Sequence, residues 1–429
     1  MDILRIIAKK RNAEKLSKEE IQFFVDGVCS GEIKDFQTTS LLMAIFLNGL
    51  DFDETYNLTI SMAKSGEVID LSDVGNCFDK HSTGGVSDTT TIVVVPTLAA
   101  LGVKVAKMSG RSLGFTGGTA DKMEVFNGYK NEISPEQFKH LIRQNGASIV
   151  SQSEKLAIAD RIIYKLRSES GTVENMGLIA SSIMSKKLAC GAKTIIIDCK
   201  YGNGAFMKTI GDAKALAKLM VDIGKKVGVK VCAIISNMNQ PLTGFVGNNL
   251  EVYSALSVLN GEENNLSKLS KFIVAKALVM DGVARDIESG LRMASEKIKS
   301  GSAKEKLKTI VLAQGGDISI IDSPQLLLPK NNSFSIVAKT AGYVEAINTA
   351  LLGDLAHKLQ IINGEIKRQD DTGFILNVEI GMRVEIGDNL LTCYYNELDN
   401  IQEFKAELEK VIIIGSKQLK IKLIEEVIE

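Results

Sequence analysis

Apolar positions in the first 65 residues recur at helical spacing. Three segments, 21–29, 37–50 and 53–66, carry this pattern, and each has a polar start and a glycine near its end. Ser, Asp and Asn favour helix starts, and glycine favours helix ends. The pattern therefore predicts a small all-α unit at the N-terminus.

From about residue 90 the pattern changes to short β-branched runs that alternate with amphipathic helices. The runs at 103–108, 194–199 and 229–235 predict strands, and 213–227 predicts a helix with one apolar stripe and a stop at Gly228. This alternation predicts an α/β layer with a mainly parallel sheet. Residues 89–101 have a strand-like composition, but their length and the cap-like Ser87 or Asp88 before them favour a helix.

Residues 178–189 return to a helical pattern, and we expect them to pack on the N-terminal helices. The last hundred residues differ again. Segments 334–347 and 375–395 predict strands and glycine turns, followed by a helix at 401–412 and a final strand at 420–427. This part of the chain predicts an α+β tail domain.

Composition limits the classes of function. The chain has 429 residues, enough for two or three domains, and a formal net charge of −1, so no long-range field attracts nucleic acid or an anionic membrane. Its N-terminus lacks a signal-peptide pattern and no segment has the apolar length of a membrane helix, so we expect a cytoplasmic protein. Six cysteines without CxxC spacing and only three histidines argue against a disulfide framework and a zinc site.

The first candidate motif is DKHSTGGVSDTTT at 79–91. Its paired glycines allow close backbone approach, and Lys80, Ser82, Thr83 and Thr91 are suitable anion-binding groups. A helix that follows would add its N-terminal amides to a phosphate site. The same residue types also form ordinary solvated turns, so the motif alone leaves both interpretations open.

The second motif is KMSGRSLGFTGGTADK at 107–122, which follows a predicted strand and is rich in glycine and hydroxyl groups, with Ser109 and Thr119 among them. Loops at the carboxyl ends of parallel strands are where α/β proteins usually bind ligands. The motif matches neither GxGxxG nor the Walker pattern, which argues against dinucleotide and P-loop sites.

The third motif combines Arg167 with LIASSIMSKKLA at 178–189. Ser182 and Lys186 are four residues apart and share one helix face, where a hydroxyl, an ammonium and a nearby guanidinium can hold a planar ligand with carbonyl oxygens. Such residues are more often the wet face of a helix. Tyr164 and Phe206 are candidates for stacking on a base, although single aromatic residues are more often core or rim.

Together, DKHSTGG, AKMSGR with TGGTADK, LIASSIMSKKLA and SNMNQPL resemble the pyrimidine/thymidine phosphorylases in order and spacing over essentially the whole chain. The resemblance implies a nucleoside phosphorylase class II-like fold: an all-α domain (1–65 plus 162–192), an α/β domain with a mixed, mainly parallel sheet (70–160 plus 193–328) and a C-terminal α+β domain (329–429). It also implies a homodimer held through the α domain and a cleft that closes by hinge motion.

The resemblance further implies a transferase, a pentosyltransferase that splits uridine, thymidine or deoxyuridine by reversible phosphorolysis, with inorganic phosphate as co-substrate and no required cofactor. Phosphate would attack C1′ with inversion, giving an α-D-(deoxy)ribose 1-phosphate. The implied catalytic residues are His81, Arg167 and Lys186, with Ser182, Tyr164 and Phe206 completing the base site. The implied phosphate site is Lys80, Ser82, Thr91, Lys107, Ser109 and Thr119.

His81 would protonate the departing base, as the unperturbed pKa of histidine, near 6.5, allows. Strict thymidine enzymes of the family tend to carry methionine in place of Lys107, so this residue favours the broader pyrimidine enzyme. A strict thymidine phosphorylase remains an alternative.

The chain also departs from the family pattern. SESGTVENMG at 168–177 alters the hinge beside the base site, Ser87 and Ser112 replace glycines, and Phe115 replaces a histidine. A monovalent cation, K+, bound in some relatives would lie near Thr89 and Leu242, but Ser254 replaces the glutamate that they use, which argues against that site.

Two further alternatives stay open. An anthranilate phosphoribosyltransferase-type enzyme has the same domain plan, but it would require a GTGGD loop and acidic magnesium ligands, and KHSTGG is a poor substitute. A non-catalytic paralogue that binds nucleoside or phosphate would explain the altered hinge. Neither nucleic acid nor a membrane is expected as a partner.

Overall fold

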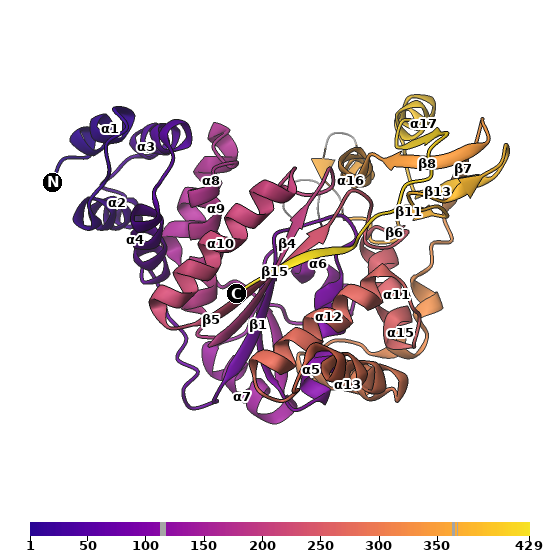
Figure 1. Cartoon of the computed structure of the whole chain (residues 1–429), viewed down its shortest axis with the longest axis horizontal. Helices are drawn as coiled ribbons and strands as arrows, with labels where there is room; N and C mark the ends of the chain where they lie inside the picture. Colours follow the sequence, from indigo (N-terminus) through magenta and orange to yellow (C-terminus); the bar gives the residue numbers. More distant parts are fainter. Residues whose placement is uncertain (112–116, 363–364, 367) are drawn as a thin grey trace.

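The computed structural model describes residues 1–429 except 112–116, 363–364 and 367. Helices gather at the N-terminal end of the molecule, a twisted sheet lies in the middle, and smaller sheets lie at the opposite end (Figure 1). This layout agrees with the predicted fold class of a helical unit, an α/β layer and an α+β tail.

The N-terminal helices are α1 (Ile3–Arg11), α2 (Lys18–Ser30), α3 (Asp35–Asn48) and α4 (Phe52–Ala63). Ser17 and Glu20 form a capping box at the start of α2, and Gly31 ends this helix with φ 75°. Two later helices, α8 (Ile158–Ser170) and α9 (Met176–Ala189), share one apolar core with them. The predicted packing of 178–189 on the N-terminal helices is therefore confirmed.

The central sheet has the strand order β15-β5-β4-β1-β2-β3. Its strands are β1 (Cys77–Ser82), β2 (Lys104–Ser109), β3 (Ala147–Ser151), β4 (Thr194–Tyr201), β5 (Lys230–Asn237) and β15 (Ile424–Ile428). The first five run parallel, and β15 pairs antiparallel with β5. Strand β1 lies between β4 and β2, so its carboxyl end opens at the middle of the sheet edge.

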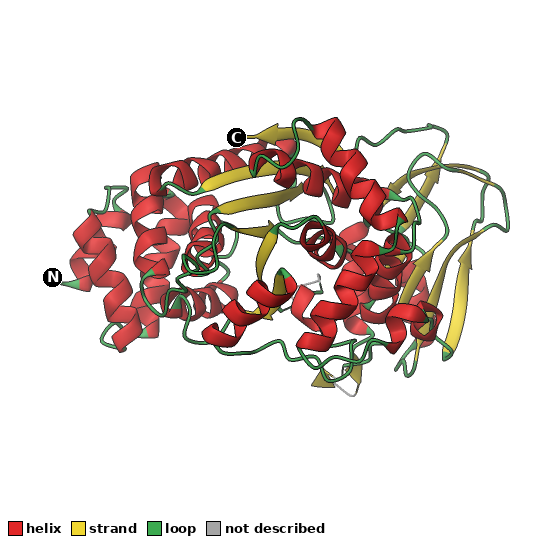
Figure 2. Cartoon of the chain, turned by 90° about the horizontal axis from the view of Figure 1, so that it is seen from below, coloured by secondary structure: helices red, strands yellow, loops and turns green. Residues whose placement is uncertain are grey.

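Helices cover both faces of this sheet, as the view from below shows (Figure 2). The helices of this part of the chain, which pack on the sheet or on one another, are α5 (Thr90–Ala100), α6 (Thr119–Met123), α7 (Pro135–Asn145), α10 (Ile210–Val227), α11 (Asn248–Leu259), α12 (Asn265–Met280), α13 (Ile287–Lys299), α14 (Ser302–Ala313) and α15 (Ser319–Asp322), with a 3-10 turn at Pro324–Leu327. The amphipathic helix predicted at 213–227 is α10, and Gly228 ends it in the left-handed conformation.

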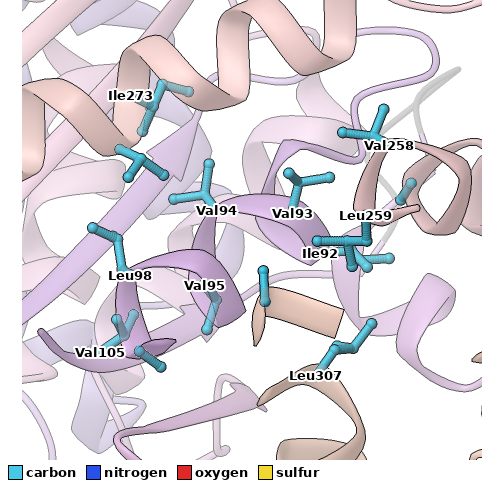
Figure 3. Packing of buried hydrophobic residues seen from close by; sticks show 14 of the residues in the cluster. Ile92, Val93, Val94, Val95, Leu98, Val105, Val258, Leu259, Ile273 and Leu307 are labelled. Atoms are coloured by element: carbon cyan, nitrogen blue, oxygen red, sulfur yellow. The ribbon is translucent and has the colours of Figure 1, made fainter. Parts of the chain in front are cut away.

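Residues 89–101 form a helix, α5, as predicted. Its residues from Thr90 to Ala99 are buried, because α11, α12 and α14 surround it and the sheet lies beneath it. Figure 3 shows Ile92, Val93 and Val94 pointing into this packing from different sides of the helix. Burial on all sides explains the strand-like composition. Among the described residues, no helix has both the length and the hydrophobicity needed to cross a bilayer.

The tail contains one sheet in the order β6-β11-β13-β7 and another in the order β12-β8-β14. Strand β6 (Phe245–Val246) comes from the α/β part of the chain and pairs with β11. The elements of the tail itself are β7 (Asn332–Val337), β8 (Gly342–Ile347), α16 (Thr349–Lys358), β9 (Ile361–Ile362), β10 (Glu365–Ile366), β11 (Gly373–Leu376), β12 (Arg383–Val384), β13 (Asn389–Tyr395), α17 (Ile401–Leu408) and β14 (Ile412–Gly415). The predicted α+β character of this part is confirmed.

Two details differ from the expectations. The final strand, β15, is expected in the tail but returns to the central sheet, where Ile424 and Val427 pack on the main core and its backbone covers the edge of β5 (Figure 1). Residues 79–82 are expected in a loop but belong to β1, with Asp79 and Lys80 almost fully buried. Ion pairs from neighbouring elements compensate these buried charges.

Candidate active site

A cavity of about 650 Å³ opens at the carboxyl ends of β1, β2 and β3 and reaches across to α8 and α9. This is the edge at which parallel sheets usually bind ligands. Every predicted catalytic, base-binding and phosphate-binding residue lines it: Lys80, His81, Ser82, Thr91, Lys107, Ser109, Thr119, Tyr164, Arg167, Ser182, Lys186 and Phe206. The structure thus brings together residues that are far apart in the sequence.

One wall of the cavity is built by the end of β1 and the N-terminus of α5. The Lys80 ammonium is buried and donates a hydrogen bond to Thr90 Oγ1, and Ser82 Oγ donates to Asp88 Oδ2. Thr91 lies in the first turn of α5, where the helix dipole and unpaired amides favour an anion. The start of α5 and the buried ammonium give this wall the positive charge that favours a phosphate group.

Lys80 belongs to a buried cluster of four charges. Its Nζ lies 3.9 Å from Asp88 Oδ2 and 4.0 Å from Asp198 Oδ2, and Lys200 Nζ lies 3.7 Å and 2.8 Å from the same two atoms. Burial lowers the pKa of Lys80, although the two carboxylates oppose this effect. Burial alone would raise the pKa of Asp88, but the ammonium groups of Lys200 and Lys80 and the hydrogen bonds it accepts hold that pKa well below its usual value.

Asp88, Asp198 and Lys200 were not predicted as parts of this cluster. A signal was present around the strand predicted at 194–199, because Asp198 within it and Lys200 directly after it follow an apolar run. They are two residues apart, so they point to the same face of β4. Two opposite charges on one face of a buried strand indicate partners on a neighbouring strand.

A second group of buried lysines lies beneath the end of β2. Lys187 Nζ donates to Asp79 Oδ2 and to Met108 O, each at 2.7 Å, and Lys107 Nζ donates to Met108 O at 3.0 Å. Burial and the positive charge of Lys187 lower the pKa of Lys107 well below its usual value, with Asp79 acting in the opposite direction. Lys107 thus lies in a positive environment that an anion in the cavity would stabilise.

His81 lies between these two groups of lysines and is only partly exposed, to the cavity. Burial lowers the pKa of its imidazole well below 6.5, and the nearby ammonium groups of Lys187, Lys107, Lys186 and Lys80 lower it further. The pKa of His81 therefore lies below the unperturbed value near 6.5. At neutral pH its ring is uncharged, with one N–H donor and one acceptor nitrogen.

The opposite wall is formed by α8 and α9. Lys186 Nζ donates to Ser182 Oγ at 2.8 Å, which confirms that these residues share a helix face, and to Asp160 Oδ2 at 2.6 Å. The Tyr164 ring lies 5.9 Å from Lys186 Nζ and 5.7 Å from the Arg167 guanidinium carbon. Cations at this distance are attracted to the face of an aromatic ring, so the wall presents two cations around one aromatic side chain.

Arg167 has an additional role that the sequence did not indicate. Its guanidinium donates to three backbone carbonyls, of Thr172 at 3.3 Å, Val173 at 2.5 Å and Leu178 at 3.1 Å. Burial lowers its pKa to about 10, so it remains charged at neutral pH. Arg167 thus fixes the backbone of the altered 168–177 segment and also lines the cavity.

Of the other departures from the family pattern, Ser87 is buried with φ 63°, in the left-handed region that favours glycine. Its hydroxyl shares a hydrogen bond of 2.7 Å with Thr243 Oγ1, which offsets part of this strain. Ser112 and Phe115 lie outside the described residues.

The position at which the resemblance suggested a monovalent cation is built by Thr89, Leu242 and Ser254. Thr89 Oγ1 and Ser254 Oγ are buried without a hydrogen-bond partner in the described part of the chain. Ser254 carries no charge, and the nearby Glu251 carboxylate is paired with Lys122 Nζ at 2.6 Å, which also donates to Asp88 O. Leu242 is buried beside the same loop, and its N–H donates to Val86 O. An ammonium, Lys122 Nζ, therefore already lies beside this loop and pairs with the Glu251 carboxylate.

Within the described ranges, no group of three or more His, Cys, Asp and Glu side chains is arranged to hold a metal ion. The charged side chains that line the cavity are those of lysines, arginines, aspartates and glutamates.

Comparison with solved structures shows the fold of this scaffold. The crystal structure of anthranilate phosphoribosyltransferase (TrpD) from Thermus thermophilus superposes with a TM-score of 0.61 over 73% of this chain and 99% of that chain. Sequence identity is 18%, so this likeness shows the fold alone.

Comparison of sequences is more specific. The family models described as "Glycosyl transferase family, helical bundle domain" and "Glycosyl transferase family, a/b domain" match residues 4–66 and 74–304. The chain is 43% identical over 434 aligned positions to "Pyrimidine-nucleoside phosphorylase" from Staphylococcus haemolyticus (strain JCSC1435), with 100% of both chains covered. It is 44% identical to the protein of that name from Staphylococcus epidermidis, with 97% of both covered. The chain therefore belongs to the pyrimidine-nucleoside phosphorylase family of glycosyl transferases and is a pentosyltransferase enzyme.

Proposed function

We propose that this enzyme catalyses the reversible phosphorolysis of pyrimidine nucleosides, including uridine, thymidine and deoxyuridine. The products are the free base and an α-D-(deoxy)ribose 1-phosphate, formed by attack of phosphate on C1′ with inversion. The observation that carries this proposal is the two-sided cavity, with buried lysines and the start of α5 on one wall and Lys186, Ser182 and Arg167 on the other. The names of the relatives agree with this reaction.

On the first wall, Lys80, Ser82, Thr91, Lys107, Ser109 and Thr119 bind inorganic phosphate. Positioning of phosphate beside C1′ converts a bimolecular attack into a step within one complex. The lowered pKa of Lys107 supports this assignment, because a dianion next to it would restore its charged form. Phosphate also relieves the mutual repulsion among the lysines that surround His81.

On the second wall, Lys186, Arg167 and Ser182 bind the carbonyl oxygens of the pyrimidine, and Tyr164 and Phe206 line the space for its ring. As the glycosidic bond breaks, its electron pair moves to the base and the sugar gains oxocarbenium character. Cations that meet this new negative charge stabilise the transition state more than the ground state.

The proton balance fits a neutral His81. Hydrogenphosphate carries one proton more than the sugar 1-phosphate dianion, and the departing base needs one proton. A neutral imidazole donates its N–H to the base and regains a proton at its other nitrogen, so His81 need not start as an imidazolium.

The test is an assay of free base released from uridine, thymidine and deoxyuridine by the purified full-length protein, with and without phosphate. We expect phosphate-dependent release from all three nucleosides. Release from the thymine nucleoside alone would favour the strict thymidine enzyme, and the absence of release from any of them would overturn the proposal.

We also propose that the enzyme is a homodimer held through its N-terminal helices. On α3, Phe36, Met43 and Leu47 lie on one face and are 69%, 39% and 73% exposed, and Leu4 on the neighbouring α1 is 62% exposed. An exposed apolar stripe of this kind marks an interaction surface.

Size-exclusion chromatography with light scattering tests this proposal. We expect Phe36→Asp to shift the protein to monomer, whereas Leu312→Asp, at a 55% exposed position on α14, leaves the dimer intact. A monomeric wild-type protein would contradict the proposal.

A further inference from the structure

We propose that Ser82 and Asp88 make the phosphate wall selective for an oxyanion that carries a proton, such as hydrogenphosphate, over a fully deprotonated one such as sulfate. The inference rests on the proposed function in one respect, namely that this wall binds phosphate. The direction of the hydrogen bond between Ser82 and Asp88 decides whether Ser82 offers a donor or an acceptor to the cavity.

The Ser82 hydroxyl has a single hydrogen, and it is directed to Asp88 Oδ2. The other carboxylate oxygen, Oδ1, accepts from Thr90 Oγ1 at 2.6 Å and from Thr90 N at 3.2 Å. Ser82 and Asp88 both line the cavity. With its hydrogen engaged, Ser82 Oγ presents only lone pairs to a ligand.

The direction of this bond is fixed by the surroundings of Asp88. Lys80 Nζ and Lys200 Nζ lie 3.9 Å and 3.7 Å from Asp88 Oδ2, and the side chain is only 8% exposed. Two ammonium groups at these distances keep the carboxylate ionised, so it has no hydrogen to donate to Ser82. Rotation of the Ser82 hydroxyl toward a ligand would remove a hydrogen bond from a buried carboxylate, which is costly.

Thr90 cannot take over as the donor to a bound anion. Its hydroxyl donates to Asp88 Oδ1 and accepts from Lys80 Nζ, so its one hydrogen is also engaged. The cavity at this point therefore offers an acceptor within a wall that otherwise supplies donors and positive charge. An oxyanion with a P–OH group donates a hydrogen bond to Ser82 Oγ. Sulfate instead places an unprotonated, negatively charged oxygen against the lone pairs of Ser82 Oγ.

Sulfate and hydrogenphosphate are matched probes, since both are tetrahedral dianions at pH 8 and only one carries a hydrogen. Isothermal titration calorimetry of the full-length protein with each inorganic anion, at constant ionic strength, measures the selectivity without nucleoside or turnover. We expect phosphate to bind about 10- to 100-fold more tightly than sulfate, the effect of one hydrogen bond to a charged group.

Substitutions separate an acceptor from a donor. Ser82→Ala should lower phosphate affinity toward that of sulfate and leave sulfate affinity unchanged or improved, whereas Ser82→Thr keeps the hydroxyl and the selectivity. Ser109→Ala is the matched control from the same wall and should weaken the binding of both anions to the same extent. Circular dichroism checks that each variant is folded.

Equal affinity of the wild-type protein for both anions would overturn this inference alone. An equal loss of affinity for both anions in Ser82→Ala would also overturn it, because Ser82 would then be a donor. Binding of neither anion by the wild-type protein would overturn the phosphate site of the proposed function together with the inference. Selective binding of phosphate without phosphorolysis would leave the inference standing and refute the proposed reaction.

Discussion

Replacement of Lys186 by methionine is the most direct test of how the base site works. Methionine keeps the length and apolar character of the side chain and removes the ammonium. If Lys186 meets charge that develops on the departing base, its loss removes about 2.7–4 kcal/mol of transition-state stabilisation, or about 100- to 1,000-fold in kcat/KM, as for an oxyanion-hole donor. Lost affinity for the nucleoside alone would instead raise KM with kcat unchanged.

The structure also predicts a side effect that has to be separated from catalysis. Lys186 is the ion-pair partner of Asp160, whose side chain is 4% exposed, so Lys186→Met leaves a buried carboxylate unpaired. Loss of one partner of a buried pair destabilises a fold by about 3–5 kcal/mol, and because Lys186 is itself 24% exposed we expect a smaller effect.

The double variant Lys186→Met with Asp160→Asn removes the unpaired charge. It should recover stability in urea unfolding while kcat/KM for phosphate-dependent base release stays low. A single variant within tenfold of the wild-type kcat/KM would refute the role of Lys186, and so would recovery of activity in the double variant.

Two other predictions concern stability. The pKa of His81 is lower in the folded than in the unfolded chain, so the unfolded state takes up a proton first as the pH falls below about 6.5, and stability falls with it. Urea unfolding without phosphate measures this effect. Between pH 7.5 and 5.5, the free energy of unfolding of the wild type should fall by up to about 1.4 kcal/mol more than that of His81→Gln, and equal decreases would refute the lowered pKa of His81. At Ser87, with φ 63°, the glycine variant should be about 1–2 kcal/mol more stable than the alanine variant, since both lack the hydroxyl and only alanine is strained. Equal stability would show that the position is unstrained.

Much of the fold could be predicted because local signals agreed with it. The capping box at Ser17 and Glu20 and the glycines after α2 and α10 set helix boundaries that periodicity had already indicated. Strand β1 could not be recognised, because CFDKHS is a largely polar sequence. Its Asp79 and Lys80 are buried only because Lys187 and Asp198 arrive from other elements, and hydrophobic periodicity carries no information about such partners.

The site shows the same limit. The resemblance supplied the residues that line the cavity, but the pKa of His81 depends on lysines from several separate elements, which sequence reasoning could not place around it. Likewise, Asp88 was seen only as a helix cap, and its role as the acceptor for Ser82 and Thr90 depends on how β1 enters α5.

The return of β15 to the central sheet has a consequence for folding. Strand β5 pairs on one side with β4, which is close in sequence. On its other side it pairs with β15, which follows the whole tail in the chain. Contacts between segments so far apart form slowly, and an unpaired strand edge is a template for pairing with another chain. During synthesis or refolding, the β5 edge is therefore the place where we expect aggregation to begin, and a chain cut before Ile424 should remain vulnerable there permanently.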